Sequence, residues 1–386
     1  MNPKKVLLNI ITFVCFISLL GTAKADIYKD NNIPDYIKTK IQKIVDSPSH
    51  MDGIDGFRRK PRKQRIKDNI RWYKKYGKVN DRYNAYCLDI ENFGNQNNFI
   101  DSSTGLNPQE NIDKSQIKFS IDNKLSLQSA VRKKYKDLSK PVYFRFKGEK
   151  ILDFKYSEIK NCTKTRSALK KLPDGKFFIK PQSDCKGKNA MILVKTGGKL
   201  KFTHVSRGEI SLREFLKITS CRAFFVQDYI EQHEALKALN PTTLNTIRLI
   251  TTKFNKKPRV LCAGLRMGKN TKTIVDNASR GGIFVGINVE TGKLKKYGFS
   301  KHGHAMKEHP ESKIQFENYQ LPFWKECISA AKKFHMLNPG YTSVGWDIAI
   351  TPKGPVLIEG NSGWGGYIPN TTCRGIRKLW ERSKRI

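Results

Sequence analysis

Short runs of apolar, β-prone residues separated by polar turns dominate the chain from residue 176 onward, which predicts a strand-rich region there. The predicted strands are 176–180, 189–195, 224–230, 245–253, 258–266, 282–289, 343–350 and 356–361. Helical spacing of apolar residues predicts helices at 124–138, 210–218 and 321–336. Because the strands often follow one another as hairpins, the pattern favours an α+β fold over a doubly wound parallel sheet.

The first third of the chain is basic and has few predicted strands. Residues 30–75 read as helical with a break at Pro61, and residues 91–118 are rich in Asn, Gln, Ser and Asp, which is typical of a loop or linker. Such basic runs are more often a solvated face than a binding arm, although an anionic surface suits them. The predicted divisions are a leader at 1–25, a basic helical extension and linker at 26–118, the main folded region at 119–376 and a basic tail at 377–386.

The last two predicted strands form the most informative local pattern. A Pro-Lys-Gly turn joins them, so together they predict an antiparallel hairpin. If Thr351 pairs with Pro355, then Asp347 lies directly opposite Glu359. Facing Cβ atoms are about 4.5–5.5 Å apart, which is close enough for two carboxylates to share a divalent cation.

Strand periodicity places Asn361 on the same face as Glu359. Two carboxylates and an amide oxygen make a hard-oxygen set suited to Mg²⁺ that carries nucleotide phosphates. The alternative is a solvent-facing strand edge whose acids have no role. The scarcity of acids in this chain, 34 Asp and Glu against 73 Lys and Arg, and the apolar neighbours of Asp347 and Glu359 favour the metal site.

Two further segments suggest nucleotide contacts. Lys180 ends a predicted strand just before a loop at 182–188, where a lysine can meet nucleotide phosphates as a point charge, although most strand-end lysines are simply exposed. The strand that starts at Phe224 leaves through a polar exit, which consists of Gln227, Asp228, Tyr229, Ile230 and Glu231. A flat base can lie against such an exit, with Glu231 at the ribose hydroxyls; the alternative is a core strand followed by a cap.

Two predicted strands each carry one arginine among apolar neighbours, Arg248 and Arg266. Arginine in a β-core is rarely left unpaired, so both residues predict an anionic partner. A phosphoryl group in transfer is one candidate, and a buried Arg–Asp pair is the other.

The net charge of +39 over 386 residues is the outlier of the composition, and hydrophobic residues make up 38% of the chain. The apolar content indicates a globular body, and the charge suggests a polyanionic partner such as an anionic membrane surface or an acidic glycan. Genome bias toward lysine is the alternative explanation. Nucleic acid is the less favoured partner, because the aromatic residues are not interleaved with arginine in a stacking pattern.

Residues 1–25 have the layout of a secretory signal peptide: a basic start, an apolar run over 6–20 and an Ala-x-Ala end before Asp26. We expect export with cleavage before Asp26. An uncleaved membrane anchor is the first alternative and a cytoplasmic protein the second. Seven cysteines remain after residue 25, an odd and irregularly spaced set that is no disulfide framework, and this favours the anchored form.

The strand-end lysine, the Gln-Asp-Tyr-Ile-Glu exit, the Asn-x-x-Arg strand and the Asp…Glu-x-Asn hairpin follow one another in a fixed order. This order resembles the ATP-grasp superfamily, most closely its sugar-transfer-associated family, which is related to glutamate ligases. Tyr73–Gly77 and Asp122–Leu125 are similar to the leading segments of that family. The resemblance extends over residues 70–375.

The resemblance implies an ATP-grasp fold, in which two α+β subdomains hold ATP between them. It implies that Lys180 contacts the ATP phosphates and that Gln227, Asp228, Tyr229 and Ile230 form the adenine hinge, with Glu231 at the ribose. It also implies that Asp347, Glu359 and Asn361 bind Mg²⁺, and that Arg248 and Arg266 stabilise the γ-phosphate in transit.

The implied activity is carboxylate activation by ATP, in which an acyl phosphate is attacked by an amine or a similar nucleophile. The acceptor is expected to be a surface glycan or an attached amino acid. An ATP-dependent kinase on the same fold and a non-catalytic basic polyanion-binding protein are the alternatives. The sequence identifies neither the acid nor the acceptor.

Overall fold

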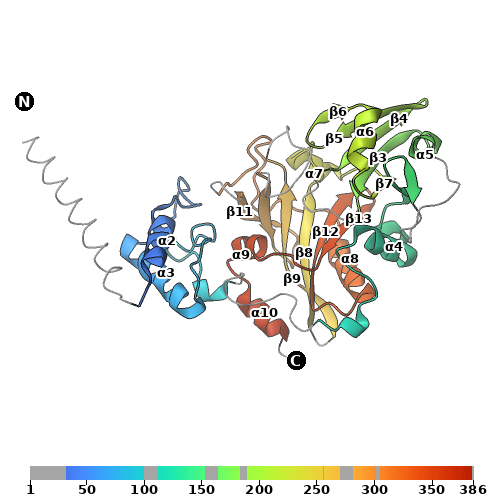
Figure 1. Cartoon of the computed structure of the whole chain (residues 1–386). Coiled ribbons are helices and arrows are strands. Elements are labelled where there is room, and N and C mark those ends of the chain that lie inside the picture. The colour runs from blue at the N-terminus through green and yellow to red at the C-terminus, as the bar shows by residue number, and fades with distance from the viewer. Residues whose placement is uncertain are drawn as a thin grey trace, which may run out of the picture.

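The computed structural model describes residues 32–99, 112–152, 164–182, 189–254, 256–269, 281–300 and 305–384. A small helical module at the N-terminal side is followed by two antiparallel sheets, of seven and six strands (Figure 1). The predicted leader at 1–25 lies outside the described residues. Within the described ranges, no helix has both the length and the apolar character that crossing a bilayer requires.

The N-terminal module is built on two helices, α2 (Asp35–Asp46) and α3 (Arg62–Tyr76). Apolar residues at helical spacing on α2 pack against Ile66 of α3. Pro61 immediately precedes α3, so the break predicted there is the start of this helix, where a proline costs no hydrogen bond. A short turn, η1 (Gln96–Asn98), closes the module.

The seven-stranded sheet has the order β2-β1-β7-β3-β4-β5-β6. Its strands are β1 (Val142–Lys147), β2 (Lys150–Leu152), β3 (Gly175–Pro181), β4 (Met191–Thr196), β5 (Lys199–His204), β6 (Gly208–Ile210) and β7 (Phe224–Asp228). Two helices accompany it, α5 (Thr165–Lys171) and α6 (Leu212–Thr219), and Ser211 with Glu214 forms a capping box at the start of α6. One face of this sheet packs on α6, chiefly through phenylalanines of the strands and of the helix.

The six-stranded sheet has the order β11-β10-β9-β8-β12-β13. Its strands are β8 (Thr246–Phe254), β9 (Lys257–Met267), β10 (Ile283–Ile287), β11 (Leu294–Ser300), β12 (Ser343–Thr351) and β13 (Gly354–Asn361). Around it lie η3 (Lys114–Gln116), α4 (Lys124–Lys134), η4 (Lys136–Leu138), α7 (Glu234–Leu239), α8 (Trp324–Leu337), α9 (Tyr367–Cys373) and α10 (Arg377–Lys384). The largest apolar core lies between this sheet and α8.

The predicted α+β class is confirmed, and each of the eight predicted strands has a counterpart in β3, β4, β7 to β10, β12 or β13. Five strands were not predicted, namely β1, β2, β5, β6 and β11. Two of these are only three residues long, and β5 (KLKFTH) and β11 (LKKYGFS) carry lysines that weaken the apolar signal. A strand that is stabilised mainly by backbone pairing to its neighbours has only a weak strand signal in its own sequence.

His335 on α8 is a fully buried titratable group in the main core. Trp346 Nε1 donates to Thr251 Oγ1 at 2.8 Å, and this hydroxyl lies 2.7 Å from His335 Nδ1. His335 Nε2 lies 2.9 Å from the carbonyl oxygen of Tyr341, which can only accept. The Tyr341 carbonyl fixes a proton on Nε2, and the Thr251 hydroxyl can face Nδ1 whether or not the ring carries a second proton there. Burial lowers the pKa of His335 to about 4.

We therefore predict a specific loss of stability in acid. Between the folded pKa of about 4 and the unfolded value near 6.5, the unfolded chain binds a proton that the folded chain does not. Stability is full above pH 6.5 and falls as the pH drops toward 4. Urea unfolding should show that the wild type loses about 2 kcal/mol more than His335→Gln between pH 7 and 4.5. Parallel losses in the two proteins would contradict the prediction, because other acids titrate in both.

Candidate functional site

The hairpin of β12 and β13 brings Asp347 opposite Glu359, as predicted. The route to this pairing differs from the prediction, because Thr351 pairs with Gly354 and not with Pro355. The turn is therefore one residue shorter than expected. A bulge at Ile358 restores the register, because Ile348 pairs with Leu357 and Asp347 then pairs with Glu359.

The bulge at Ile358 also decides which face Glu359 occupies. Leu357 is buried in the main core beneath α8, and without an extra residue Glu359 would point to the same side two positions later. The bulge turns Glu359 to the opposite face, beside Asp347. It also leaves the Ile358 carbonyl oxygen accepting from Gln128 Nε2 at 3.0 Å and from Lys180 Nζ at 3.4 Å. Lys180 belongs to the other sheet, so this contact joins the two subdomains.

Asp347 is buried and held by both predicted arginines. Arg248 donates from Nε to Oδ1 and from Nη2 to Oδ2, the latter at 2.9 Å, and Arg266 Nη1 donates to Oδ2 at 2.8 Å. Burial raises the pKa of Asp347, but the positive charges of Arg248 and Arg266 outweigh it and hold the pKa well below its usual value. The structure thus contains the buried Arg–Asp pair that was the alternative to a phosphoryl partner.

Glu359 lies within hydrogen-bonding contact of Asp347 and forms an ion pair with Lys124, whose Nζ is 3.2 Å from Oε2. Asn361 lies opposite Gly345 and uses Nδ2 to approach its carbonyl oxygen at 3.5 Å. Lys124, on the first turn of α4, was not among the predicted site residues. Its segment was noted only as a family resemblance, since nothing in a surface helix start indicates a partner 235 positions away.

Lys180 is almost completely buried, with 6% of its surface exposed. Burial and the charge of Lys124 lower its pKa to about 7, against the opposing effect of Glu359. Its ammonium nitrogen also lies 5.2 Å from the centre of the Phe225 ring. A lysine this close to neutrality accepts a proton readily when an anion arrives.

Arg145 on β1 is a second buried cation that the sequence did not indicate. It pairs with Phe225, which pairs in turn with Lys180, so the three side chains share one face of the seven-stranded sheet. Its Nε donates to Gln182 Oε1 at 2.5 Å. Because β1 was not predicted, no pattern marked Arg145 as a site residue.

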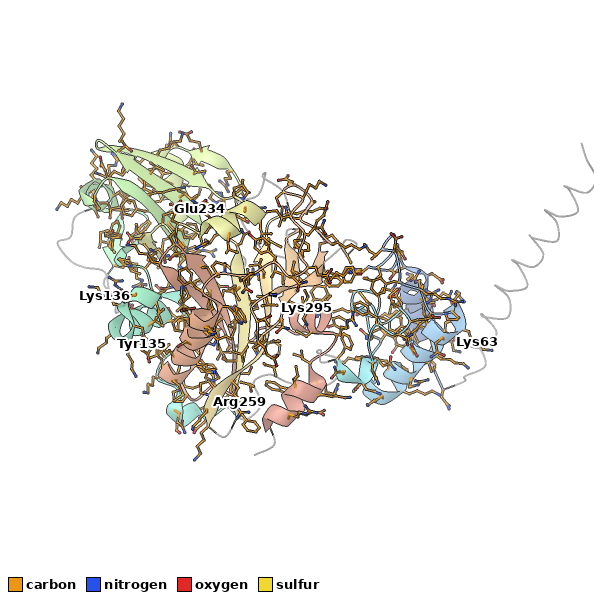
Figure 2. All side chains as sticks on the ribbon, turned by 180° about the vertical axis from the view of Figure 1, so that it is seen from behind. Lys63, Tyr135, Lys136, Glu234, Arg259 and Lys295 are labelled. Carbon is orange, nitrogen blue, oxygen red and sulfur yellow. The ribbon has the colours of Figure 1, made fainter. Side chains whose placement is uncertain are left out.

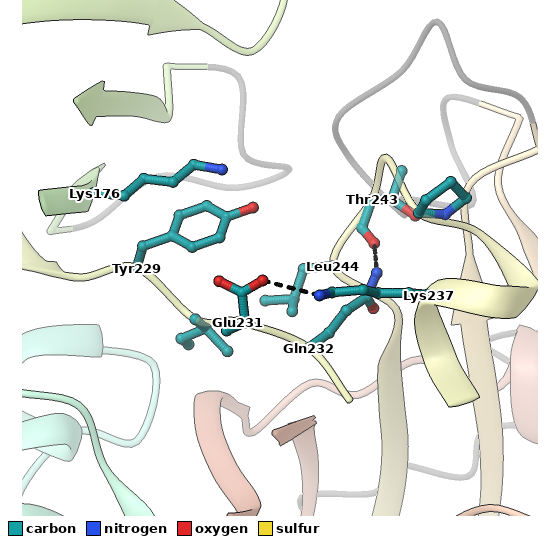
Figure 3. Close-up of a pocket in the computed structure, with 9 residues that line it drawn as sticks. Lys176, Tyr229, Glu231, Gln232, Lys237, Thr243 and Leu244 are labelled. Carbon is teal, nitrogen blue, oxygen red and sulfur yellow. Dashed lines mark hydrogen bonds and ion pairs between the residues drawn. The ribbon is translucent and has the colours of Figure 1, made fainter. Parts of the chain in front are cut away.

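The predicted hinge segment lines a pocket of about 130 Å³ (Figure 3). Tyr229, Ile230 and Glu231 belong to its lining. Glu231 forms an ion pair with Lys237 at 2.9 Å, and the Lys176 ammonium lies 3.9 Å from the centre of the Tyr229 ring. The pocket thus offers an aromatic and apolar wall beside a carboxylate.

Two hinge residues do not line this pocket. Asp228 accepts a hydrogen bond from Tyr143 at 2.6 Å, and Gln227 is buried with an amide oxygen that has no hydrogen-bond partner among the described residues. Positions 183–188 of the loop that follows Lys180 lie outside the described residues. His309 is buried, and its Nε2 lies 2.9 Å from the Gly268 carbonyl oxygen.

The donor set at the hairpin fits Mg²⁺. Asp347 receives three hydrogen bonds from the arginines, while a carboxylate has about four acceptor positions. Glu359 and the amide of Asn361 add hard oxygen donors on the same face. Among the described residues no group of three His, Cys, Asp or Glu side chains is placed to hold a metal ion. A cation here would therefore have two carboxylates and an amide, and would need phosphates and water as its other ligands, which is usual for Mg²⁺.

Comparison with known proteins identifies the fold. A sequence model of the family "Sugar-transfer associated ATP-grasp" matches residues 109–379, well over half of the chain. No curated protein matches.

Among solved structures, the chain is similar to a D-alanine–D-alanine ligase from Bacillus anthracis, with 11% identity, 68% of this chain and 65% of that chain covered, and a TM-score of 0.35. It is also similar to an L-amino acid ligase from Bacillus licheniformis, with 10% identity, 69% and 48% coverage, and a TM-score of 0.37. The chain spans less than two thirds of the length of either protein. These TM-scores are low, so the identification rests on the family match.

The arginine–aspartate cluster yields a prediction on stability. Asp347→Asn removes the charge that pairs with two nearly buried guanidinium groups, so we expect a loss of about 3–5 kcal/mol in the free energy of unfolding. Glu359→Gln is the matched control on the facing strand, where the pair with Lys124 is more exposed, and it should cost about 1 kcal/mol or less. Urea unfolding measures both. Equal losses would show that the buried cluster does not stabilise the fold.

Proposed function

The chain belongs to the sugar-transfer associated ATP-grasp family, and on this premise we propose that it is an ATP- and Mg²⁺-dependent carboxylate ligase. In the proposed reaction, an oxygen of the substrate carboxylate attacks the γ-phosphorus of ATP. An acyl phosphate forms and ADP leaves. An amine or a similar nucleophile then attacks the acyl carbon, and inorganic phosphate leaves with the bonding electron pair.

The charge balance at the junction of the two sheets is the observation that carries this proposal. Four basic side chains surround the carboxylates of Asp347 and Glu359. The basic residues are Lys124, Lys180, Arg248 and Arg266. The surplus of positive charge with so little exposure is costly unless an anion compensates it. A Mg²⁺-triphosphate carries a net charge of about −2, which matches this surplus once Lys180 is protonated.

Each group has a definable part in this scheme. The pocket at Tyr229 to Glu231 takes the base and the ribose, with Glu231 at the ribose hydroxyls. Lys180 and Lys124 bind phosphate oxygens. Asp347, Glu359 and Asn361 would hold Mg²⁺, which when bound neutralises phosphate charge.

Arg248 and Arg266 are held in place by Asp347, and they exchange part of this contact for the phosphoryl group in transfer. The donors are in position before charge develops, which is the condition for electrostatic stabilisation of the transition state.

The acceptor and the location are the finer part of the proposal. The family's association with sugar transfer supports a surface glycan, or an amino acid attached to one, as the acceptor. We infer an exported or anchored protein from the leader-like residues 1–25, and the reaction then requires a compartment in which ATP is supplied.

The central test is trapping of the acyl phosphate. Wild-type protein, given Mg-ATP, a panel of carboxylic acids and hydroxylamine, should form a hydroxamate with one class of acid and release phosphate. Glu359→Gln should lose about 100-fold or more of this turnover, because a metal ligand becomes neutral. Glu209→Gln is the control. Glu209 lies on β6 and forms an exposed ion pair with Lys201 on β5, so this variant should keep the wild-type turnover. ADP formation with phosphate transferred to a hydroxyl, and no hydroxamate, would favour the kinase alternative instead.

A second prediction concerns Lys180 and nucleotide affinity. At pH 8 this lysine is mostly neutral, because its pKa is about 7, and a bound triphosphate favours the ammonium form. Mg-ATP binding should therefore take up about one proton at pH 8, measured by calorimetry in buffers of different ionisation enthalpy. Lys180→Met should bind about 10-fold or more weakly and take up no proton.

Lys195→Met is the matched control for this measurement. Lys195 lies on the same sheet, but its Nζ pairs with Asp174 at 2.6 Å, away from the hairpin. The Lys195→Met variant should bind Mg-ATP like the wild type and take up about one proton as the wild type does. Unchanged affinity in Lys180→Met would move the phosphate site elsewhere.

A further inference from the structure

Two cysteines far apart in the sequence meet on the face of the six-stranded sheet opposite α8. Cys262 lies in β9, and Cys373 is the last residue of α9. Their thiols share a hydrogen bond. Both belong to one apolar cluster, which also contains Trp364, Ile376 and Trp380.

Backbone geometry supports this contact independently of the thiols. A Cβ placed on Gly264, two positions along β9 from Cys262, would lie 3.9 Å from Thr372 Oγ1 and 3.5 Å from Ile368 Cγ2. Lys295 of β11 donates to the Thr372 carbonyl oxygen at 3.0 Å, and Figure 2 shows Lys295 on the side of the sheet toward the N-terminal module. The end of α9 is therefore fixed over β9 next to Cys262.

Cys373 also stands where three parts of the molecule join. The guanidinium of its neighbour Arg374 lies 4.5 Å from the centre of the Phe93 ring in the N-terminal module. Asn98 Nδ2 of that module donates to the Arg374 carbonyl oxygen at 3.2 Å, and Arg377 Nη2 donates to the Phe99 carbonyl oxygen at 3.0 Å. A covalent bond at Cys373 would fasten the catalytic sheet, the C-terminal helices and this module together.

We propose that Cys262 and Cys373 form a disulfide that fastens this junction, by exchange with an accessible disulfide of a small molecule or of an oxidoreductase. The Cys373 thiolate attacks one sulfur of that disulfide, a mixed disulfide forms, and the first thiolate leaves. Cys262 loses its proton and attacks Cys373 Sγ, and the second thiolate leaves. Two protein thiols are oxidised and one disulfide is reduced to two thiols, so electrons and protons balance.

The order of attack follows from the surroundings of the two thiols. The hydrogen bond from Cys262 and the nearby Lys295 charge lower the pKa of Cys373 to about 6, although burial opposes them. That bond and burial raise the pKa of Cys262. Cys373 is half-buried and Cys262 is buried, so the more accessible thiol is also the better nucleophile at neutral pH.

The other described cysteines offer no such pair. Cys87 and Cys327 are each buried in separate apolar clusters, and burial raises the pKa of both. Cys221 is exposed on the other subdomain. A disulfide at 262–373 closes a loop of more than 100 residues, the range in which loop closure restricts the unfolded chain most.

Peptide mapping tests the proposal on the wild-type protein. The folded full-length chain is incubated with oxidised glutathione, free thiols are alkylated, and trypsin digestion is followed by mass spectrometry without reduction. The expected product links Val260–Arg266 to Gly354–Arg374 and disappears on reduction. The Tm of the oxidised protein should rise by about 5 °C relative to the reduced protein.

Two variants separate this site from general oxidation. Cys373→Ser should abolish both the linked peptides and the rise in Tm, whereas Cys221→Ser should keep both. The proposal is overturned if Cys262 and Cys373 are alkylated as fully after oxidation as before, or if the linked peptides form without a rise in Tm. Neither measurement involves nucleotide, so the result is independent of the proposed ligase activity.

Discussion

The carboxylate of Asp347 is the constraint on which the arrangement of the site depends. It is a buried anion on β12, and it is shared by two guanidinium groups from β8 and β9. Three neighbouring strands of the sheet therefore contribute to one charged cluster. A slip of one residue in any of these strands would turn its charge to the other face and leave a partner unpaired beneath apolar residues. The cluster therefore fixes the register of β8, β9 and β12 at the point where the chemistry is proposed.

The bulge at Ile358 connects this charged cluster to the edge strand β13 and to the second sheet. It lets Leu357 fill the core while Glu359 joins Asp347, and its carbonyl oxygen receives Lys180 from β3. Residues from both subdomains thus converge on one stretch of β13. The two sheets supply different parts: the six-stranded sheet carries the carboxylates and arginines, and the seven-stranded sheet carries the buried lysine and leads into the pocket at Tyr229 to Glu231.

The sequence predicted the parts of the site that depend on local alternation, and it did not predict those that depend on packing. Asp347 and Glu359 were placed correctly because a hairpin has few registers, even though the turn is shorter and a bulge compensates. Lys124 and Arg145 were missed because their partners lie on distant elements. The choice between a phosphoryl group and an aspartate as partner of the arginines was open, because an apolar strand shows that an anion is needed and not which one.

The same physical need explains how one cluster can serve both folding and catalysis. Buried arginines require an anion at all times, and Asp347 supplies it in the structure. A phosphoryl group brings further negative charge to donors that are already oriented, so little reorganisation opposes transfer. The cost falls on stability, because the four cations exceed the two carboxylates, and Lys180 lowers that cost by giving up its proton near pH 7. In the proposed reaction, nucleotide binding returns the proton, and the charges that strain the free protein then bind the substrate.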